Sequence, residues 1–181
     1  MYQRILVPLD GSKQAESALP FADKLARIYN GEITLLHVVE YPFEMYSECH
    51  PNVLNILTQT NEKLQTEKDA FCKEAEDYLK RLASMMETTV SQVSIEVQEC
   101  PIVEAILSTV DRLKIDLIVM STVGRDENPW MMGAIANRIL REAPVPVILI
   151  RKSSYASIAD RLPQSTSVQK EALVLPGTLS Y

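Results

Sequence analysis

The sequence predicts an α/β protein: a single domain with a five-stranded, mostly parallel sheet that is doubly wound, with helices on both of its faces. Short aliphatic runs alternate along the chain with longer segments whose apolar residues recur every three or four positions. Such alternation is typical of parallel strands joined by right-handed helical crossovers. Two of the short runs, ILVPL and LIVM, are apolar throughout, as expected of central strands that are buried on both sides.

The first half of the domain is predicted as strand, helix, strand and helix. Arg4–Leu9 is an aliphatic run that ends at the turn residues Asp-Gly-Ser, which indicates a strand. Ala15–Tyr29 has helical spacing with a kink or late start expected at Pro20, and the Asn-Gly pair after it is a helix stop. Glu32–Val39 is predicted as the second strand. After an irregular stretch, Asn61–Met86 is predicted as a long helix with a solvated face rich in Glu and Lys.

The second half continues the same alternation. Val93–Val97 alternates apolar and polar residues as a strand does, and Ile102–Leu113 follows with helical spacing. Leu117–Met120 is the apolar fourth strand. A helix that ends near Ala143-Pro144 comes next, and the apolar run Val145–Ile150 is predicted as the fifth strand.

Length and composition indicate one globular unit and a tail. The 181-residue chain is 46% apolar, which is enough for one core, and we expect a domain over residues 1–151 and a tail over residues 152–181. Ser153–Tyr181 is rich in Ser and Thr, contains Pro163 and Pro176, and is expected to be extended or partly disordered. Its apolar run ALVLP leaves docking as an extra strand as the alternative.

Charge and cysteine content argue against several functional classes. With 24 acidic and 18 basic residues the formal net charge is −6, whereas nucleic-acid binding rests on clustered Lys and Arg. The three cysteines form no Cys-x-x-Cys pair, so neither a zinc site nor a redox motif is indicated. No signal peptide is visible, and no apolar run approaches the ~18 residues that span a membrane. We therefore expect a cytoplasmic protein without nucleic-acid, membrane or metal partners.

The loop after the fourth predicted strand suits an anion. It is built of small residues, Ser121 to Gly124, and it leads into a helix, whose N-terminus carries partial positive charge. In a doubly wound sheet the ligand sits where the strand order reverses. If the first and fourth strands are neighbours, Pro8–Ser12 and Ser121–Arg125 line that crevice.

Four segments, in this order and spacing, resemble the universal stress protein family. They are ILVPLDGS at residues 5–12, LLHVV at 35–39, DLIVM with its glycine loop from 116, and VPVILIR at 145–151. The resemblance covers about residues 1–151 and implies a Rossmann-like fold of the adenine nucleotide alpha hydrolase type. It also implies a stress-related regulatory function with a binding site for AMP, ADP or ATP, with Mg²⁺ only beside a triphosphate. The residues it assigns to nucleotide binding are Pro8, Leu9, Asp10, Val38, Met120, Ser121, Thr122, Gly124, Arg125, Gly133 and Ala134.

The resemblance gives these residues separate roles. Asp10 would accept hydrogen bonds from the ribose hydroxyls, Pro8 and Leu9 would border the base, and Val38 would contact adenine. Gly124 and Gly133 would let the main chain approach the phosphates. Neither a catalytic residue nor a metal ligand is implied.

The phosphate loop departs from the family pattern. Ser121 replaces the first loop glycine, and eight residues rather than nine separate Gly124 from Gly133. Ala134 replaces a hydroxyl residue that could cap the helix and bind a phosphate oxygen. Asn128-Pro129 offers another helix start, which would move the positive helix end away from the usual phosphate position.

Two functions therefore stay open. The intact PLDGS segment, and the guanidinium fork of Arg125 beside the loop, favour an adenine-nucleotide-responsive regulatory protein. The altered loop favours a nucleotide-independent interaction or scaffold protein of the same fold, and mono- or diphosphates over a triphosphate. An enzyme is not expected, because no Walker-type Gly-Lys-Ser/Thr is present, and any ATP hydrolysis should be slow.

Several of these residues also have purely structural interpretations. Asp10 is typical of turns, Gly124 would supply a positive φ, and Gly133 would permit close helix packing. His37 lies in an apolar strand and is interpreted as a structural histidine, because no nucleophile accompanies it.

The final strand predicts self-association. An apolar strand at a sheet edge must be covered, and antiparallel pairing of Val145–Ile150 with a second copy would cover it. We expect a homodimer through this strand. A further protein partner is left open, with Trp130 as a core or interface residue.

Overall fold

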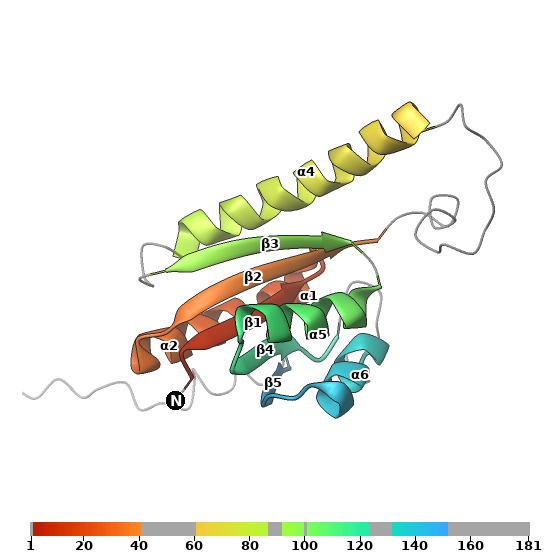
Figure 1. Ribbon diagram of the computed structural model, residues 1–181. Coiled ribbons are helices and arrows are strands. Elements are labelled where there is room, and N and C mark those ends of the chain that lie inside the picture. The colour runs from red at the N-terminus through yellow and green to blue at the C-terminus, as the bar shows by residue number, and fades with distance from the viewer. Residues whose placement is uncertain (1, 41–60, 87–91, 100, 124–131, 152–181) are drawn as a thin grey trace, which may run out of the picture.

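The computed structural model describes residues 2–40, 61–86, 92–99, 101–123 and 132–151. They form a five-stranded sheet of order β3-β2-β1-β4-β5 in which all four pairings are parallel (Figure 1). The predicted fold class is confirmed, and β1 and β4 are neighbours as the crevice requires. The strands are β1 (Arg4–Leu9), β2 (Glu32–Val39), β3 (Val93–Glu99), β4 (Leu117–Ser121) and β5 (Val147–Ile150).

Helices cover both faces of the sheet. α1 (Lys13–Glu16), α2 (Leu19–Tyr29) and α4 (Asn61–Met86) bury Ala15, Ala22 and Leu79 against one face. α5 (Ile102–Leu113) and α6 (Ala134–Glu142) bury Ile106 and Ile139 against the other (Figure 1). The two clusters are separated by the sheet, so the core has the three-layer arrangement of a doubly wound fold.

Strand alternation decides which side chains reach which face. In β1, Ile5, Val7 and Leu9 belong to the core under α2 and α4, whereas Leu6 belongs to the core under α5 and α6. Because successive side chains in a strand point to opposite faces, Pro8 lies on the α5–α6 face. The same parity holds in β4, where Val119 belongs to the core under α1, α2 and α4, and Met120 belongs to the core under α5 and α6.

The predicted helix Ala15–Tyr29 is broken into two. α1 is capped by Ser12, whose side-chain oxygen accepts the Ala15 N–H at 3.1 Å, and it ends at Glu16. α2 then starts at Leu19 with Pro20 in its first turn, where the missing N–H of proline costs nothing. The interruption predicted at Pro20 is therefore a restart of the helix.

The end of α2 lies where the sequence predicted it, at the Asn-Gly pair. Asn30 caps α2 in the left-handed conformation with φ 51°, and a Cβ on Gly31 would lie 2.8 Å from the backbone oxygen of Gln3. This close approach of two backbones explains the glycine.

Two boundaries near the crevice differ from the prediction. α6 begins at Ala134, so the start proposed at Asn128-Pro129, which lies outside the described residues, is wrong for this helix. The reason is long-range: Gly133 is extended, and its N–H donates to the Thr122 carbonyl at 2.8 Å. β5 begins at Val147 rather than Val145, because Pro146 cannot donate to a ladder.

Candidate functional site

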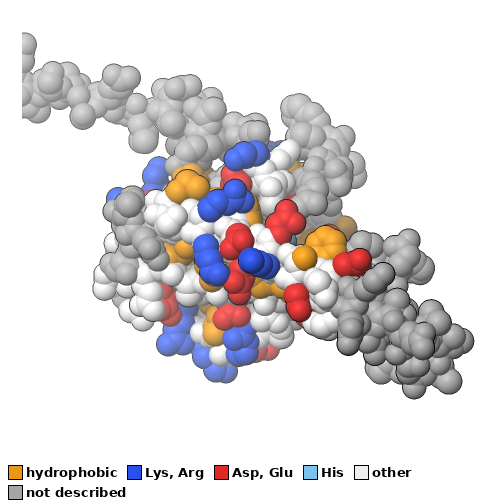
Figure 2. Space-filling view, turned by 90° about the horizontal axis from the view of Figure 1, so that it is seen from above, with side chains coloured by type: hydrophobic (Ala, Val, Ile, Leu, Met, Phe, Trp, Pro, Cys, Tyr) orange, Lys and Arg blue, Asp and Glu red, His pale blue; other side chains and the backbone are white. Residues whose placement is uncertain are grey.

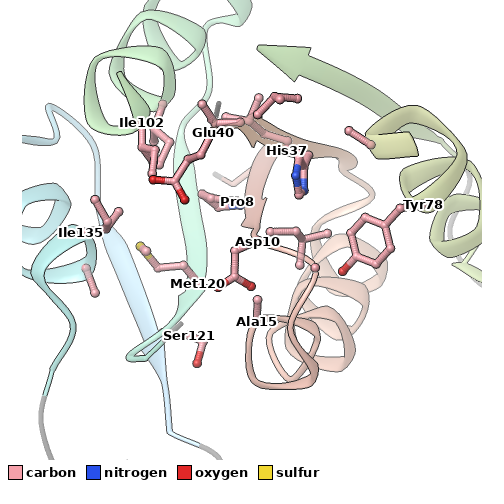
Figure 3. Close-up of a pocket in the computed structure, with 18 of the residues that line it drawn as sticks. Pro8, Asp10, Ala15, His37, Glu40, Tyr78, Ile102, Met120, Ser121 and Ile135 are labelled. Carbon is pink, nitrogen blue, oxygen red and sulfur yellow. The ribbon is translucent and has the colours of Figure 1, made fainter. Parts of the chain in front are cut away.

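A cavity of about 750 Å³ opens at the carboxyl ends of β1, β2 and β4 (Figure 3). It lies where the strand order reverses between β1 and β4, which is where doubly wound folds bind their ligands. Its volume falls within the ~300–1,000 Å³ of small-molecule and cofactor sites. The crevice predicted from the sequence is thus present.

The cavity straddles the edge of the sheet, and we call the parts lined from its two faces the α5–α6 lobe and the α4 lobe. The α5–α6 lobe is lined from the sheet by Pro8, Val38 and Met120, and from the helices by residues that include Ile102 and Ile135. The α4 lobe lies on the other face and is lined by Leu9, Ala15, His37, Phe71, Glu74, Ala75, Tyr78 and Arg81. Asp10 lies between the two lobes, with Met120 on one side and Tyr78 on the other (Figure 3).

Asp10 is held by the turn that follows β1. Its Oδ1 accepts the Ser12 N–H at 2.9 Å, and Gly11 adopts φ 82°, which favours glycine. The structural interpretation of Asp10 as a turn residue is therefore confirmed. The same contact fixes the carboxylate at the cavity wall.

Most described backbone donors of the phosphate loop serve the fold. The Thr122 N–H donates to the Ile150 carbonyl at 3.0 Å, and the Gly133 N–H donates to the Thr122 carbonyl. The Val123 N–H points at Ser121 Oγ, 3.4 Å away. These contacts tie the end of β4 to β5 and to the start of α6. A phosphate would therefore have to use other donors.

Thr122 offers one such donor. The residue lines the cavity with only 8% of its surface exposed, and its Oγ1 has no hydrogen-bond partner among the described residues. A buried polar group left in this state costs about 1–3 kcal/mol. The neighbouring helix α6 has Gly133 as its N-cap and therefore no side-chain cap. Its second and third residues, Ile135 and Ala136, line the cavity.

The sequence-predicted residues fall into three groups. Seven line the cavity, Gly133 and Ala134 stand at the start of α6, and Gly124 and Arg125 lie outside the described residues, as does Trp130. Gly133 is buried and Ala134 is exposed. Their contacts with a ligand stay predictions. The seven lining residues are Pro8, Leu9, Asp10, Val38, Met120, Ser121 and Thr122.

Sequence reasoning missed the contribution of α4. Phe71, Glu74, Tyr78 and Arg81 line the cavity from this helix, and their spacing of three and four residues places them on one helix face. That spacing was the available signal. Seen from the α4 side, acidic and basic side chains are interleaved on the surface, and Lys80 pairs with Glu76, so the predicted solvated face is also present (Figure 2).

The α4 lobe is electronegative around Tyr78. Burial, followed by the negative charge of Glu16, raises the pKa of the Tyr78 phenol well above its ordinary value, and Asp10 adds to the effect. The phenol oxygen lies 3.4 Å from Glu16 Oε1. The His37 ring packs edge-on against Tyr78, with centroids 5.8 Å apart, which agrees with a structural histidine.

The described parts of the chain show neither a metal centre nor a membrane span. No group of three or more His, Cys, Asp or Glu side chains in them is arranged to hold a metal ion. No helix within them is both long enough and apolar enough to cross a bilayer.

Together, the reversal of strand order and the cavity beside it define a doubly wound α/β protein with a small-molecule crevice. The sequence profile described as the universal stress protein family matches residues 1–151, and the chain belongs to that family. The resemblance seen in the four segments is confirmed.

Individual relatives agree with this assignment. Universal stress protein MJ0531 of Methanocaldococcus jannaschii is 25% identical over 154 residues, which cover 84% of each chain. The structure of UspA from Lactobacillus plantarum superimposes with a TM-score of 0.68 at 24% identity, over 83% of this chain and 98% of that one. A universal stress protein from Archaeoglobus fulgidus, solved in complex with dAMP, gives a TM-score of 0.57 at 18% identity, over 82% and 98% of the two chains.

Proposed function

We propose that the α5–α6 lobe binds an adenine nucleotide, and that the chain is a stress-related regulatory protein whose stability and interactions respond to that nucleotide. Val38, Pro8 and Met120 present apolar surface to the base, together with Ile102 of α5. Asp10, at the boundary of the lobe, accepts hydrogen bonds from the ribose hydroxyls. The phosphate lies at the opposite end, beside Thr122 and the start of α6.

The observation that carries the proposal is the state of Thr122. Its buried Oγ1 lacks a partner among the described residues, and it lies next to a helix start that has no side-chain cap. A phosphate oxygen would accept from this hydroxyl and from N–H groups of the first turn of α6. The dAMP bound by the Archaeoglobus fulgidus protein supports an adenine mononucleotide as the ligand class.

The loop geometry favours a short phosphate chain. Because Thr122, Val123 and Gly133 use their N–H groups within the protein, the described ends of the loop leave few backbone donors for a phosphate chain. We therefore rank AMP and ADP above ATP. Mg²⁺ would enter only with a triphosphate, and the role proposed is regulatory and not catalytic.

We also propose a cytoplasmic homodimer that pairs through β5. This strand is at the edge of the sheet and pairs with β4 on one side. The Pro146 and Ile150 carbonyls accept from β4 and its continuation, so the groups of Val147 and Leu149 point to the open side. Antiparallel pairing with a second copy would satisfy them.

The dimer has a sharp test in sedimentation velocity. Leu149→Pro removes a donor on the open side and should give monomers, with β4–β5 pairing retained. Ile148→Pro is the matched control, since it removes a donor to β4 and should destabilise the fold instead. A monomeric wild-type chain at micromolar concentration would refute the dimer.

One observation favours a second function. Ser121 and Ala134 replace family glycine and hydroxyl residues, and Ala134 is exposed at the start of α6. If these changes abolish phosphate binding, the chain is a nucleotide-independent interaction protein of the same fold. In that case its partner would be another protein.

Thermal unfolding with AMP, ADP, ATP and cyclic nucleotides, with and without Mg²⁺, separates the two functions. A ligand at 100 times its dissociation constant stabilises by about 2.7 kcal/mol, which raises the melting temperature by roughly 5–10 °C. Asp10→Asn keeps an oxygen for the Ser12 N–H but turns the other group into a donor, so it should remove the response. Asp111→Asn on exposed α5 surface is the control. No shift at millimolar nucleotide would refute the nucleotide proposal and favour the interaction protein.

A further inference from the structure

The α4 lobe is lined by aromatic and acidic side chains that the proposed nucleotide site does not use. It lies across the sheet edge from the α5–α6 lobe, and His37 points into it from β2 (Figure 3). Phe71, Glu74 and Tyr78 face it from α4, at positions that share one side of the helix. Tyr78 is half-buried and Phe71 and Glu74 are exposed, so the wall presents two benzenoid rings, with a carboxylate between them, to a cavity that solvent can reach.

The charges around this wall are mostly negative. Glu74 and Asp10 line the cavity, and Glu16 lies against the Tyr78 hydroxyl at 3.4 Å. Within the described residues, Arg81 is the one Lys or Arg side chain that lines the cavity, and it is exposed to solvent. Its place is about one helical turn beyond Tyr78, away from Phe71 and Glu74.

Aromatic faces and carboxylates together select for one kind of ligand. The π-faces of Phe and Tyr attract cations, and a neighbouring carboxylate strengthens the attraction. An anion would meet the repulsion of Asp10, Glu16 and Glu74. A bare metal ion does not match either, since no suitable cluster of three ligands occurs in the described part of the chain.

We propose that the α4 lobe is a second binding site that takes a small organic cation, a quaternary or primary ammonium group, between the rings of Phe71 and Tyr78 and the carboxylate of Glu74. The site is separate from the nucleotide lobe, and Asp10 is the residue that borders both. The cation site does not require that a nucleotide binds in the α5–α6 lobe.

The test compares choline with its uncharged isostere 3,3-dimethylbutan-1-ol, by isothermal titration calorimetry on the full chain. The two probes have the same shape and differ in charge. The proposal requires saturable binding of choline and weaker or undetectable binding of the alcohol. Equal binding of both probes, or none of choline at millimolar concentration, would overturn it.

Variants locate the bound cation. Glu74→Gln should weaken choline binding about two- to fivefold, as loss of a partly exposed ion pair does. Phe71→Leu removes the ring and should cost a similar two- to fivefold, the effect of an exposed cation–π contact. Asp77→Asn makes the same charge change on the same helix but outside the cavity lining, and it should leave binding unchanged.

AMP titrations keep this inference distinct from the proposed nucleotide function. Glu74→Gln and Phe71→Leu should leave AMP binding unchanged, because both residues lie in the α4 lobe. A chain that binds choline but no AMP would contradict the nucleotide proposal alone. Choline binding of unchanged affinity in both Glu74→Gln and Phe71→Leu would place the cation elsewhere and refute the α4 lobe as its site.

Discussion

Thr122→Val should be more stable than the wild type without ligand, and less stable than the wild type when a nucleotide is bound. The two side chains have nearly the same shape, and the change removes a buried hydroxyl that has no partner among the described residues. Relief of an unsatisfied group of this kind is worth about 1 kcal/mol at the lower end of its range. In a chain of this size about 1 kcal/mol raises the melting temperature by roughly 2–4 °C.

With AMP the sign should reverse. A hydrogen bond to a charged group contributes about 1.5–3 kcal/mol, so losing the Thr122 contact should weaken AMP binding by about tenfold or more. Thr109→Val is the matched control: Thr109 is fully buried, but its hydroxyl already donates to the Ala105 carbonyl at 2.8 Å. The Thr109→Val variant should lose about 1 kcal/mol of folding stability, and its affinity for AMP should be unchanged. Chemical unfolding with and without AMP measures both effects. A less stable ligand-free Thr122→Val protein would refute the reasoning.

Three further predictions concern stability. Gly31→Ala would place its Cβ 2.8 Å from the Gln3 oxygen, and overpacking of this kind should cost about 1–3 kcal/mol in urea unfolding. Asp116→Ala removes the acceptor of the Gln3 and Arg4 N–H groups, at 2.9 and 3.2 Å, and should cost about 1 kcal/mol. Asp111→Ala, at an exposed position of α5, should be near neutral. Because folding raises the pKa of Tyr78 above its ordinary 10.0, the contribution of this phenol is complete below pH 10 and is lost as the pH rises further. Above pH 10 the free energy of unfolding of Tyr78→Phe should therefore fall less with rising pH than that of the wild type. An equal pH dependence of the two proteins would contradict the shifted pKa.

The strands and the crevice could be predicted because local signals determine them. Aliphatic runs gave the central strands β1 and β4, and the Asp-Gly-Ser turn marked the point where the chain leaves the sheet. Because side chains alternate along a strand, Pro8 and Val38 then lie on the same face of the sheet, the one covered by α5 and α6. These features follow from residues that are close together in sequence.

The rest depended on contacts between distant residues. The start of α6 is set by the bond from Gly133 to the Thr122 carbonyl, eleven positions away along the chain, and no local cap signals it. Phe71 and Glu74 are exposed residues of an amphipathic helix, and they line a cavity because α4 packs across β2 and β3. A period in the sequence identifies the helix face but does not show what lies opposite it.

The altered loop and the intact turn can be reconciled through the donors that the fold leaves over. In this chain the Thr122 N–H ties the end of β4 to β5, and the Thr122 carbonyl accepts the Gly133 N–H at the start of α6, so the protein itself makes contacts that a phosphate would otherwise supply at these loop ends. The loop ends described here therefore keep their form without a ligand. A nucleotide would then add contacts at Asp10, Thr122 and the first turn of α6, without having to order β4. On these contacts of the described residues, binding should be modest in affinity and selective for short phosphate chains, because few contacts are added between the free and the bound state.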